Sequence, residues 1–116
     1  SCGVSLPLKR VYEPAKPADG IRVLVDRLWP RGVSKAKAKL DQWMKEVAPS
    51  PALRTWFGHK PERFAEFRKR YREEIAANPA VGELRKLGKR KRVTLLYGAR
   101  DPKINHAVVL LAALKR

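Results

Sequence analysis

Two groups of polar residues, each placed directly after an apolar segment, are the part of the sequence best suited to chemistry. Residues 21–25 and 93–97 have the pattern of strands. The polar segment after the first strand contains Asp26, Arg27, Trp29, Pro30 and Arg31, and the one after the second contains Arg100, Asp101, Asn105 and His106. Open parallel sheets bind ligands beyond the carboxyl ends of their strands. We therefore expect both groups to meet at one sheet edge and to form one site.

The arginines of these groups indicate an anionic ligand. A guanidinium is a planar fork that can bind two oxygens of a phosphate or carboxylate, so Arg27, Arg31 and Arg100 are candidates for holding such a group. The last helix is expected to begin near residues 101–105, and free backbone N–H groups at its start would add to the same pocket. A phosphate-bearing ligand, such as a nucleotide or a nucleic acid, fits this set of donors.

Asp26 and His106 are the candidates for proton exchange. A histidine titrates near neutral pH, and an aspartate beside arginines is expected to stay ionised. Trp29 and Tyr97 are candidates for stacking on a base or ring, and His59 is a weaker candidate for the site. The sequence has no glycine-rich phosphate loop, nucleophile elbow or metal-binding pattern, and it therefore indicates no cofactor and no metal.

Each of these assignments has a purely structural alternative. Asp26 with Arg27 or Arg100 can form an ion pair that only closes the sheet edge. Asp101, which precedes Pro102, is typical of a helix cap. His106 can be an ordinary residue at a helix start, and Trp29 can serve packing alone. The sequence leaves both sets of interpretations open.

Composition limits the class of protein. The chain has 116 residues, enough for one domain, and carries 27 Lys and Arg against 11 Asp and Glu, a net charge of +16. Such a charge favours polyanionic partners. The longest apolar run, residues 107–114, is far shorter than a membrane helix, and the lone Cys2 has no partner for an internal disulfide. We expect a cytoplasmic protein without membrane contact; its oligomeric state stays open.

The elements expected around the two groups follow from apolar periodicity and end signals. Strands are expected at 6–12, 21–25 and 93–97, with 13–20 as a rigid loop. Ser34 caps a helix that carries Leu40, Trp43, Met44 and Val47 on one face and ends before Pro49. Further helices are expected from Pro51 to Gly58, from Pro61 past Ile75, from Pro79 to Gly88, and over 107–114. The order is β-β-α-α-α-α-β-α.

Two features complete this picture. Strands separated by helices indicate a parallel α/β sheet, yet the short loop 13–20 favours an antiparallel pairing of the first two strands. The basic segment 85–92 has six positive residues of eight and enters the last strand. It should lie at the amino end of the sheet, away from the site, either as a solvated loop or as a patch that binds a nucleic-acid backbone.

Three blocks of the sequence resemble the YeaO-like small bacterial proteins of the domain of unknown function 488. The blocks are "VYEPAKPADGIRVLVDRLWPRG", "LDQWMKEVAPSPALRTWFGHKPERFAEFRKRY" and "VTLLYGARDPKINHAVVL", and the resemblance covers residues 8–114. It implies an α/β fold, with residues 1–7 as a flexible segment before one domain at 8–116. A more distant branch is similar in having a helix between the first two strands, which implies parallel pairing here and a reduced crossover at 13–20.

The resemblance implies no reaction, because the family is defined by an unknown function. The distant branch opens its last helix with Cys-His-Arg, whereas Asn105-His106-Ala107 stands here, so a cysteine nucleophile is excluded. Our first interpretation is a small enzyme or binding protein for a phosphate-bearing ligand, with arginines holding the anion and Asp26 and His106 exchanging protons. The alternative is a non-enzymatic nucleic-acid-binding protein that uses its basic surface.

Overall fold

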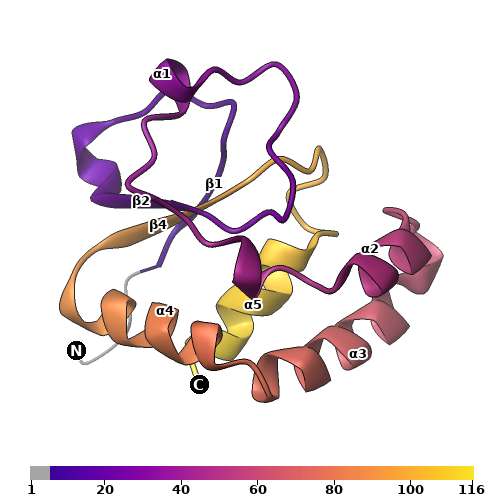
Figure 1. Ribbon diagram of the computed structural model, residues 1–116. Helices are drawn as coiled ribbons and strands as arrows, with labels where there is room; N and C mark the ends of the chain where they lie inside the picture. The colour runs from indigo at the N-terminus through magenta and orange to yellow at the C-terminus, as the bar shows by residue number, and fades with distance from the viewer. Residues whose placement is uncertain (1–5) are drawn as a thin grey trace.

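A short parallel sheet forms the centre of the molecule. The computed structural model describes residues 6–116, and within them four strands lie in the order β1-β4-β2-β3 (Figure 1). All neighbouring pairs run parallel. The strands are β1 (Leu8–Arg10), β2 (Ile21–Leu24), β3 (Gln42–Trp43) and β4 (Val93–Tyr97). The predicted α/β class with a short parallel sheet is confirmed.

Side chains cover both faces of the two central strands, which explains why β2 and β4 are almost continuously apolar. Val23 and Leu95 belong to the larger core cluster. Leu24 and Leu96, which point to the opposite face, belong to a second, smaller cluster. All four side chains have no exposed surface.

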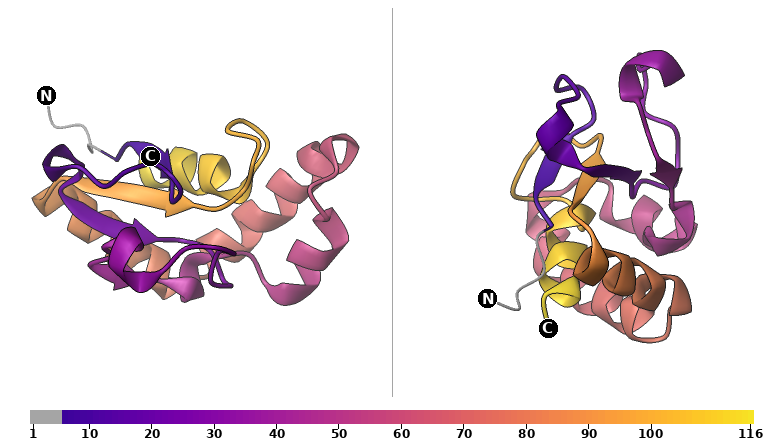
Figure 2. Two further views of the ribbon diagram at one scale, coloured as in Figure 1. Left: turned by 90° about the horizontal axis from the view of Figure 1, so that it is seen from above. Right: turned by 90° about the vertical axis from the view of Figure 1, so that its left-hand side faces the viewer.

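The helices are distributed unevenly over these two faces. Within residues 6–116 there are five α-helices: α1 (Lys35–Ala38), α2 (Pro51–Phe57), α3 (Phe64–Ala76), α4 (Pro79–Arg90) and α5 (His106–Leu114). In Figure 1, α3, α4 and α5 lie below the sheet and α1 lies above it, and the right-hand view of Figure 2 shows the same division. The lower layer therefore forms the main core, while a thin layer of loop and α1 covers the upper face.

The first two strands are parallel, as the family resemblance implied, and the antiparallel pairing that the short loop favoured is wrong. The two strands are not neighbours, because β4 lies between them. Strands on either side of a third are about 10 Å apart, twice the spacing of adjacent strands. The chain after β1 spans that distance with only a 3-10 turn, Pro17–Asp19, and needs no helix.

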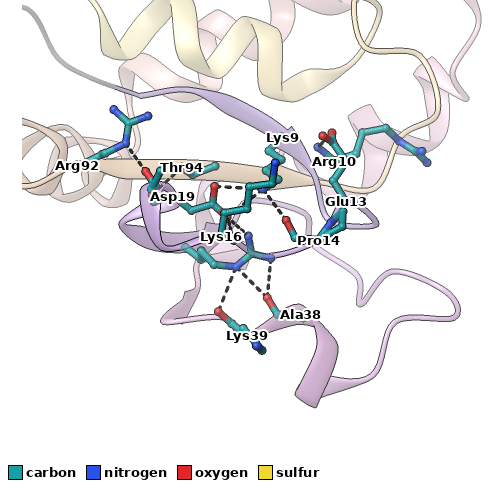
Figure 3. Close-up of polar contacts among 12 residues, drawn as sticks. Lys9, Arg10, Glu13, Pro14, Lys16, Asp19, Ala38, Lys39, Arg92 and Thr94 are labelled. Carbon is teal, nitrogen blue, oxygen red and sulfur yellow. Dashed lines mark hydrogen bonds and ion pairs between the residues drawn. The ribbon is translucent and has the colours of Figure 1, made fainter.

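A polar network around Asp19 holds this connection in place (Figure 3). The Asp19 carboxylate accepts hydrogen bonds from Lys9 Nζ at 3.1 Å and from Arg22 Nη1 at 2.6 Å. Thr94 Oγ1 donates to the Asp19 carbonyl oxygen at 2.7 Å, and Arg22 Nη2 donates to the Ala38 carbonyl oxygen at 2.7 Å. The network thus links β1, β2, β4 and α1 near the amino ends of the central strands.

The helix expected after Ser34 is mostly absent, and this prediction was wrong. Ser34 does cap a helix, but α1 ends after one turn, at Lys39, whose φ of 46° is left-handed. The next residues pair with the outer edge of β2 as the short strand β3, and a 3-10 turn, Lys45–Val47, follows. The open edge of β2 supplies backbone partners that outweigh the helical pattern: Asp41 N–H donates to Arg22 O and Met44 N–H donates to Leu24 O.

The remaining helices follow their local signals closely. Ser50 caps α2, and Gly58 ends it in a left-handed conformation. Asn78 caps α4 through a hydrogen bond from Ala80 N–H. Helix α4 continues to Arg90, however, so Gly88 does not end it, and much of the basic segment 85–92 is helical rather than a loop. As expected, that segment leads into the start of β4.

Two further features concern the chain end and the surface. Cys2 and residues 1–5 lie outside the described residues, whereas Leu6 is buried and the Pro7 carbonyl oxygen accepts a hydrogen bond from Leu95 N–H. Among the described helices, none combines the length and the apolar character that crossing a membrane requires.

Candidate functional site

A cavity of about 370 Å³ lies beyond the carboxyl ends of β2 and β4, and both polar groups reach it. We call it the arginine pocket; its lining includes Asp26, Arg27, Trp29, Arg31, Arg54, His59, Arg100 and His106, together with apolar residues such as Leu28, Pro30 and Phe57. The loop after β2, the turn after β4, the start of α5 and helix α2 all contribute. A cavity of this size lies in the range of small-molecule sites.

Asp26 and His106 meet in the wall of this pocket. His106 Nε2 lies 3.3 Å from Asp26 Oδ1 and 2.9 Å from the carbonyl oxygen of Val25. Because a carbonyl oxygen only accepts, Nε2 carries a proton and donates it to Val25. Asp26 Oδ2 accepts a hydrogen bond from Gly98 N–H at 2.9 Å. The pair therefore joins the end of β2, the turn after β4 and the start of α5.

The electrostatics of the pair differ from the expectation that arginines keep Asp26 ionised. Burial raises the pKa of Asp26, against the opposing effects of His106 and of the Gly98 hydrogen bond. Burial also lowers the pKa of His106, against the opposing effect of Asp26. Asp26 Oδ1 is buried and has no hydrogen-bond partner within the described residues. The alternative of an ion pair with Arg27 or Arg100 is not what the structure shows, because Asp26 lies against His106 instead.

Gly98 is required for the close approach of the turn to Asp26. A Cβ atom at this position would lie 3.0 Å from Asp26 Oδ2 and 3.4 Å from Pro30 Cβ. Real Cβ contacts are rarely so short, so a side chain here would push the carboxylate or the loop away. The glycine in "LLYGARD" therefore has a steric role, whereas the sequence alone indicates only a turn there.

The four arginines of the pocket are not equivalent. Arg27 is partly buried, and its guanidinium donates to the carbonyl oxygens of Pro49 at 3.1 Å and Ala48 at 3.3 Å. Arg31, Arg54 and Arg100 are exposed, and within residues 6–116 their side chains have no hydrogen-bond or ion-pair partner. Arg27 thus anchors the loop to the segment before α2, whereas the other three are available to a ligand.

Arg54 is the residue that sequence reasoning missed. It lies in α2, far from both polar groups in the sequence, and only the packing of α2 and α3 brings it to the pocket. The nearby "WFGH" stretch packs as expected, with Phe57 stacked on Phe67 at 4.3 Å between ring centroids. His59, the last residue of that stretch, reaches the pocket lining.

Three other candidates have structural contacts of their own. Trp29 lines the pocket, but its indole N–H donates to the Val33 carbonyl oxygen at 2.7 Å and its ring packs edge-on against Trp43. Tyr97 is buried in the main core, and burial raises its pKa. Asn105 is buried as the cap of α5, accepting from Val108 N–H. Tyr97 and Asn105 are outside the lining of the arginine pocket.

Asp101 was expected to cap the last helix, but Asn105 holds that position. Asp101 Oδ1 instead accepts hydrogen bonds from the N–H groups of Lys103 and Ile104, and the first of these is the main cause of the lowered pKa of Asp101. Asp101 therefore shapes the turn before α5, and Asn105 caps the helix.

A family model described as the inactive DUF488-N3 subclade matches residues 5–116. The chain belongs to the DUF488 family. The YeaO protein of Escherichia coli K12, described as uncharacterised, is 44% identical over 108 residues, covering 92% of this chain and 94% of YeaO. Uncharacterised proteins of Mycobacterium tuberculosis and Mycobacterium bovis are 50% identical over 105 residues, covering 90% of this chain and 89% of theirs. No solved structure gives a significant match. The predicted YeaO-like membership is confirmed.

Proposed function

We propose that this DUF488 protein binds the phosphate group of a small nucleotide-like ligand in the arginine pocket. The observation that supports this most directly is the convergence of Arg31, Arg54 and Arg100 from three separate segments onto one cavity. Their guanidinium groups have no partner within the described residues, so they are free to bind the oxygens of an anion.

The charge of the pocket favours an anion over a cation. Asp26 is the carboxylate of its lining, and it faces His106 at 3.3 Å. Because burial raises the pKa of Asp26, its negative charge opposes an anion less than that of an exposed carboxylate would.

The proposal is one of binding rather than turnover. The matching family model is described as an inactive subclade, which favours a member without catalysis. In addition, His106 Nε2 and Asp26 Oδ2 are already bonded to the backbone at Val25 and Gly98. A proton-transfer role for the pair, which the sequence suggests, would therefore depend on Asp26 Oδ1, which is buried and lies 3.3 Å from His106 Nε2.

Titration calorimetry with inorganic phosphate and thymidine monophosphate tests the proposal. The double variant Arg31→Gln with Arg100→Gln should weaken binding of both ligands by about tenfold or more for each guanidinium lost. Its melting temperature should stay close to that of the wild type, since both side chains are exposed and unpaired among the described residues. A matched control, Lys86→Gln with Lys89→Gln in α4, removes the same charge elsewhere and should leave binding unchanged.

Two results would contradict this proposal. One is the absence of any binding of phosphate or thymidine monophosphate to the wild-type protein at low salt. The other is an equal loss of affinity in the arginine pair and in the lysine control, which would show that net charge, rather than the pocket, attracts the anion.

A second function is favoured by the basic end of α4. Lys86, Lys89, Arg90 and Lys91 are exposed, and within residues 6–116 their side chains have no partner. This surface precedes the amino end of β4 (Figure 1), whereas the lining of the pocket includes the residues that follow the carboxyl end of β4. Such a surface can bind a nucleic-acid backbone without reading its sequence.

The salt dependence of binding to a random duplex oligonucleotide tests this second function. Affinity should fall steeply with salt, and Lys86→Gln with Lys89→Gln should reduce the slope by about 0.9 for each lost phosphate contact. Arg31→Gln with Arg100→Gln serves as the control. A slope that stays the same in the lysine variant would remove the basis for a binding surface on α4.

A further inference from the structure

A second cavity adjoins the arginine pocket, and Tyr12 lines both. The second cavity, of about 470 Å³, is formed by residues 11–15, Gly32, Val33, Lys37 and Lys39. We call it the lysine pocket. The loop after β2 passes from one cavity to the other, because Arg31 lines the first and the next residue, Gly32, lines the second. The two pockets are therefore neighbours, and we call the surface that runs across both of them the groove.

Tyr12 stands at the boundary between the pockets in a fixed position. Its hydroxyl donates a hydrogen bond to the Arg31 carbonyl oxygen at 2.9 Å. The Arg10 guanidinium lies over the ring, 4.8 Å from its centroid. The residue is nevertheless 45% exposed. An exposed aromatic ring between two basic cavities is typical of sites that stack a nucleobase.

The lysine pocket has a positive charge of its own. Lys37 and Lys39 are exposed, and their ammonium groups have no partner within residues 6–116. Glu13 is the acidic residue of this lining, and its carboxylate accepts a hydrogen bond from Arg10 N–H at 3.1 Å. Two ammonium groups against one carboxylate leave a net attraction for an anion, smaller than that of the arginine pocket.

We propose that the groove binds the phosphorylated end of a single-stranded nucleic acid, an inference that rests on the proposed phosphate binding in the arginine pocket. The terminal phosphate lies with Arg31, Arg54 and Arg100, the first base lies against Tyr12, and the next phosphate lies between Lys37 and Lys39. A single strand is required because a base that is paired and stacked in a duplex cannot offer its face to Tyr12.

Calorimetry with four probes tests this assignment: inorganic phosphate, thymidine monophosphate, and two thymidine dinucleotides, one phosphorylated at its 5′ end and one at its 3′ end. One of the dinucleotides should bind about tenfold more tightly than the monophosphate, because it adds one phosphate contact. Lys37→Gln with Lys39→Gln should abolish that gain and leave monophosphate binding unchanged. Glutamine keeps the polar side chain at Lys39, whose backbone is left-handed at φ 46°.

Two further variants sharpen the test. Glu13→Gln keeps an acceptor for Arg10 N–H but removes the negative charge, so the dinucleotide should bind severalfold more tightly. Tyr12→Ala should lower the affinity for the nucleotides by about tenfold, because stacking on the ring is lost, and should leave the affinity for inorganic phosphate unchanged. Tyr12→Phe is the control, because it keeps the ring and removes only the hydrogen bond to Arg31.

The outcomes separate this inference from the function on which it rests. If thymidine monophosphate binds but neither dinucleotide binds more tightly, the phosphate site stands and the extended groove is wrong. If the gain survives in the Lys37 and Lys39 variant, the second phosphate does not lie in the lysine pocket and the inference is wrong. If no probe binds, the proposed phosphate function itself fails.

Discussion

The two ends of β2 each hold a buried acid, and their surroundings are opposite. At the amino end, Asp19 accepts hydrogen bonds from Lys9, Lys16 N–H and Arg22. Burial raises its pKa, but those hydrogen bonds outweigh burial and bring the pKa down to about 2. At the carboxyl end, one oxygen of Asp26 faces His106 at 3.3 Å but has no hydrogen-bond partner among the described residues, and burial raises the pKa of Asp26.

This difference indicates which end is structural and which is a site. Buried polar groups are normally satisfied, and a buried acid with two cations and several hydrogen bonds has no capacity left for a ligand. Asp19 fits that description and closes the connection between β1 and β2. An acid that borders a cavity and has a buried oxygen without a hydrogen bond is less stabilising for the fold, and perturbed acids of this kind cluster at functional sites.

Replacing each acid by its amide should give the largest contrast. Asp19→Asn leaves Lys9 and Arg22 partly buried without a counter-charge, and breaking such a pair costs about 3–5 kcal/mol. Asp26→Asn keeps an acceptor for Gly98 N–H and should change the free energy of unfolding by less than about 1 kcal/mol. Urea unfolding of both variants measures the difference. Equal losses would show that Asp26 is as structural as Asp19.

The glycines beside the two acids offer a second contrast. At Gly20, φ is 65° and a Cβ would lie 2.5 Å from the Arg92 carbonyl oxygen, so Gly20→Ala should destabilise by about 2–3 kcal/mol. At Gly98 the nearest atom is the Asp26 carboxylate at 3.0 Å, a side chain that can shift. Gly98→Ala should therefore cost only about 1 kcal/mol but weaken phosphate binding. Thermal unfolding and calorimetry measure the two effects, and the reverse order of stabilities would contradict the comparison.

Lowering the pH should remove the contribution of Asp19 to the free energy of unfolding but should not remove a contribution of Asp26. The pKa of Asp19 is about 2 in the folded protein, below the ordinary 3.8. Its stabilisation is therefore fully present above pH 4 and is lost as the pH falls through 2, by about 2 kcal/mol. The difference in unfolding free energy between wild type and Asp19→Asn should shrink over this range. A difference that stays constant from pH 5 to pH 2 would show that the charge of Asp19 is unimportant.

Much of the fold could be predicted because its signals are local. Residues 21–25 and 93–97 are apolar enough to indicate central strands, and Ser50, Asn78 and Gly58 act where capping rules place them. Strand β3 could not be predicted from Gln42 and Trp43, because only the open edge of β2 makes them a strand. The predicted length of α1 was wrong for the same reason.

The candidate site divides in a similar way. The strand-end rule predicts that Asp26, Arg31, Arg100 and His106 share one cavity, and in the structure they line the same pocket. Tyr97 lies in the main core rather than in the pocket. The alternation of side chains along a strand could have indicated this, since Tyr97 shares the core-facing side of β4 with Val93 and Leu95. Arg54 had no signal, because its position depends on how α2 packs against α3. Whether these residues bind a ligand stays a prediction.

The smallest expected effect concerns the charge of the Asp26–His106 pair during binding. Sulfate is a suitable probe, because unlike phosphate it keeps its charge across the range of interest. The pKa of Asp26 lies above its ordinary 3.8 and that of His106 lies below its ordinary 6.5, so Asp26 gains its proton above pH 3.8 and His106 gains its proton below pH 6.5. Each proton makes the pocket more positive, and a bound anion favours that state.

Sulfate affinity should therefore rise severalfold as the pH falls from about 6.5 to about 4. Asp26→Asn should lose most of this rise, since it has no carboxylate to protonate, while Asp41→Asn, an exposed acid outside the pocket, should keep it. Calorimetric titrations at several pH values, with stability checked at each, give the measurement. A sulfate affinity that is flat with pH in the wild type, or a rise that is unchanged in Asp26→Asn, would mean that the charge of Asp26 does not act on the anion. The contrast between the two acids would then be one of burial alone.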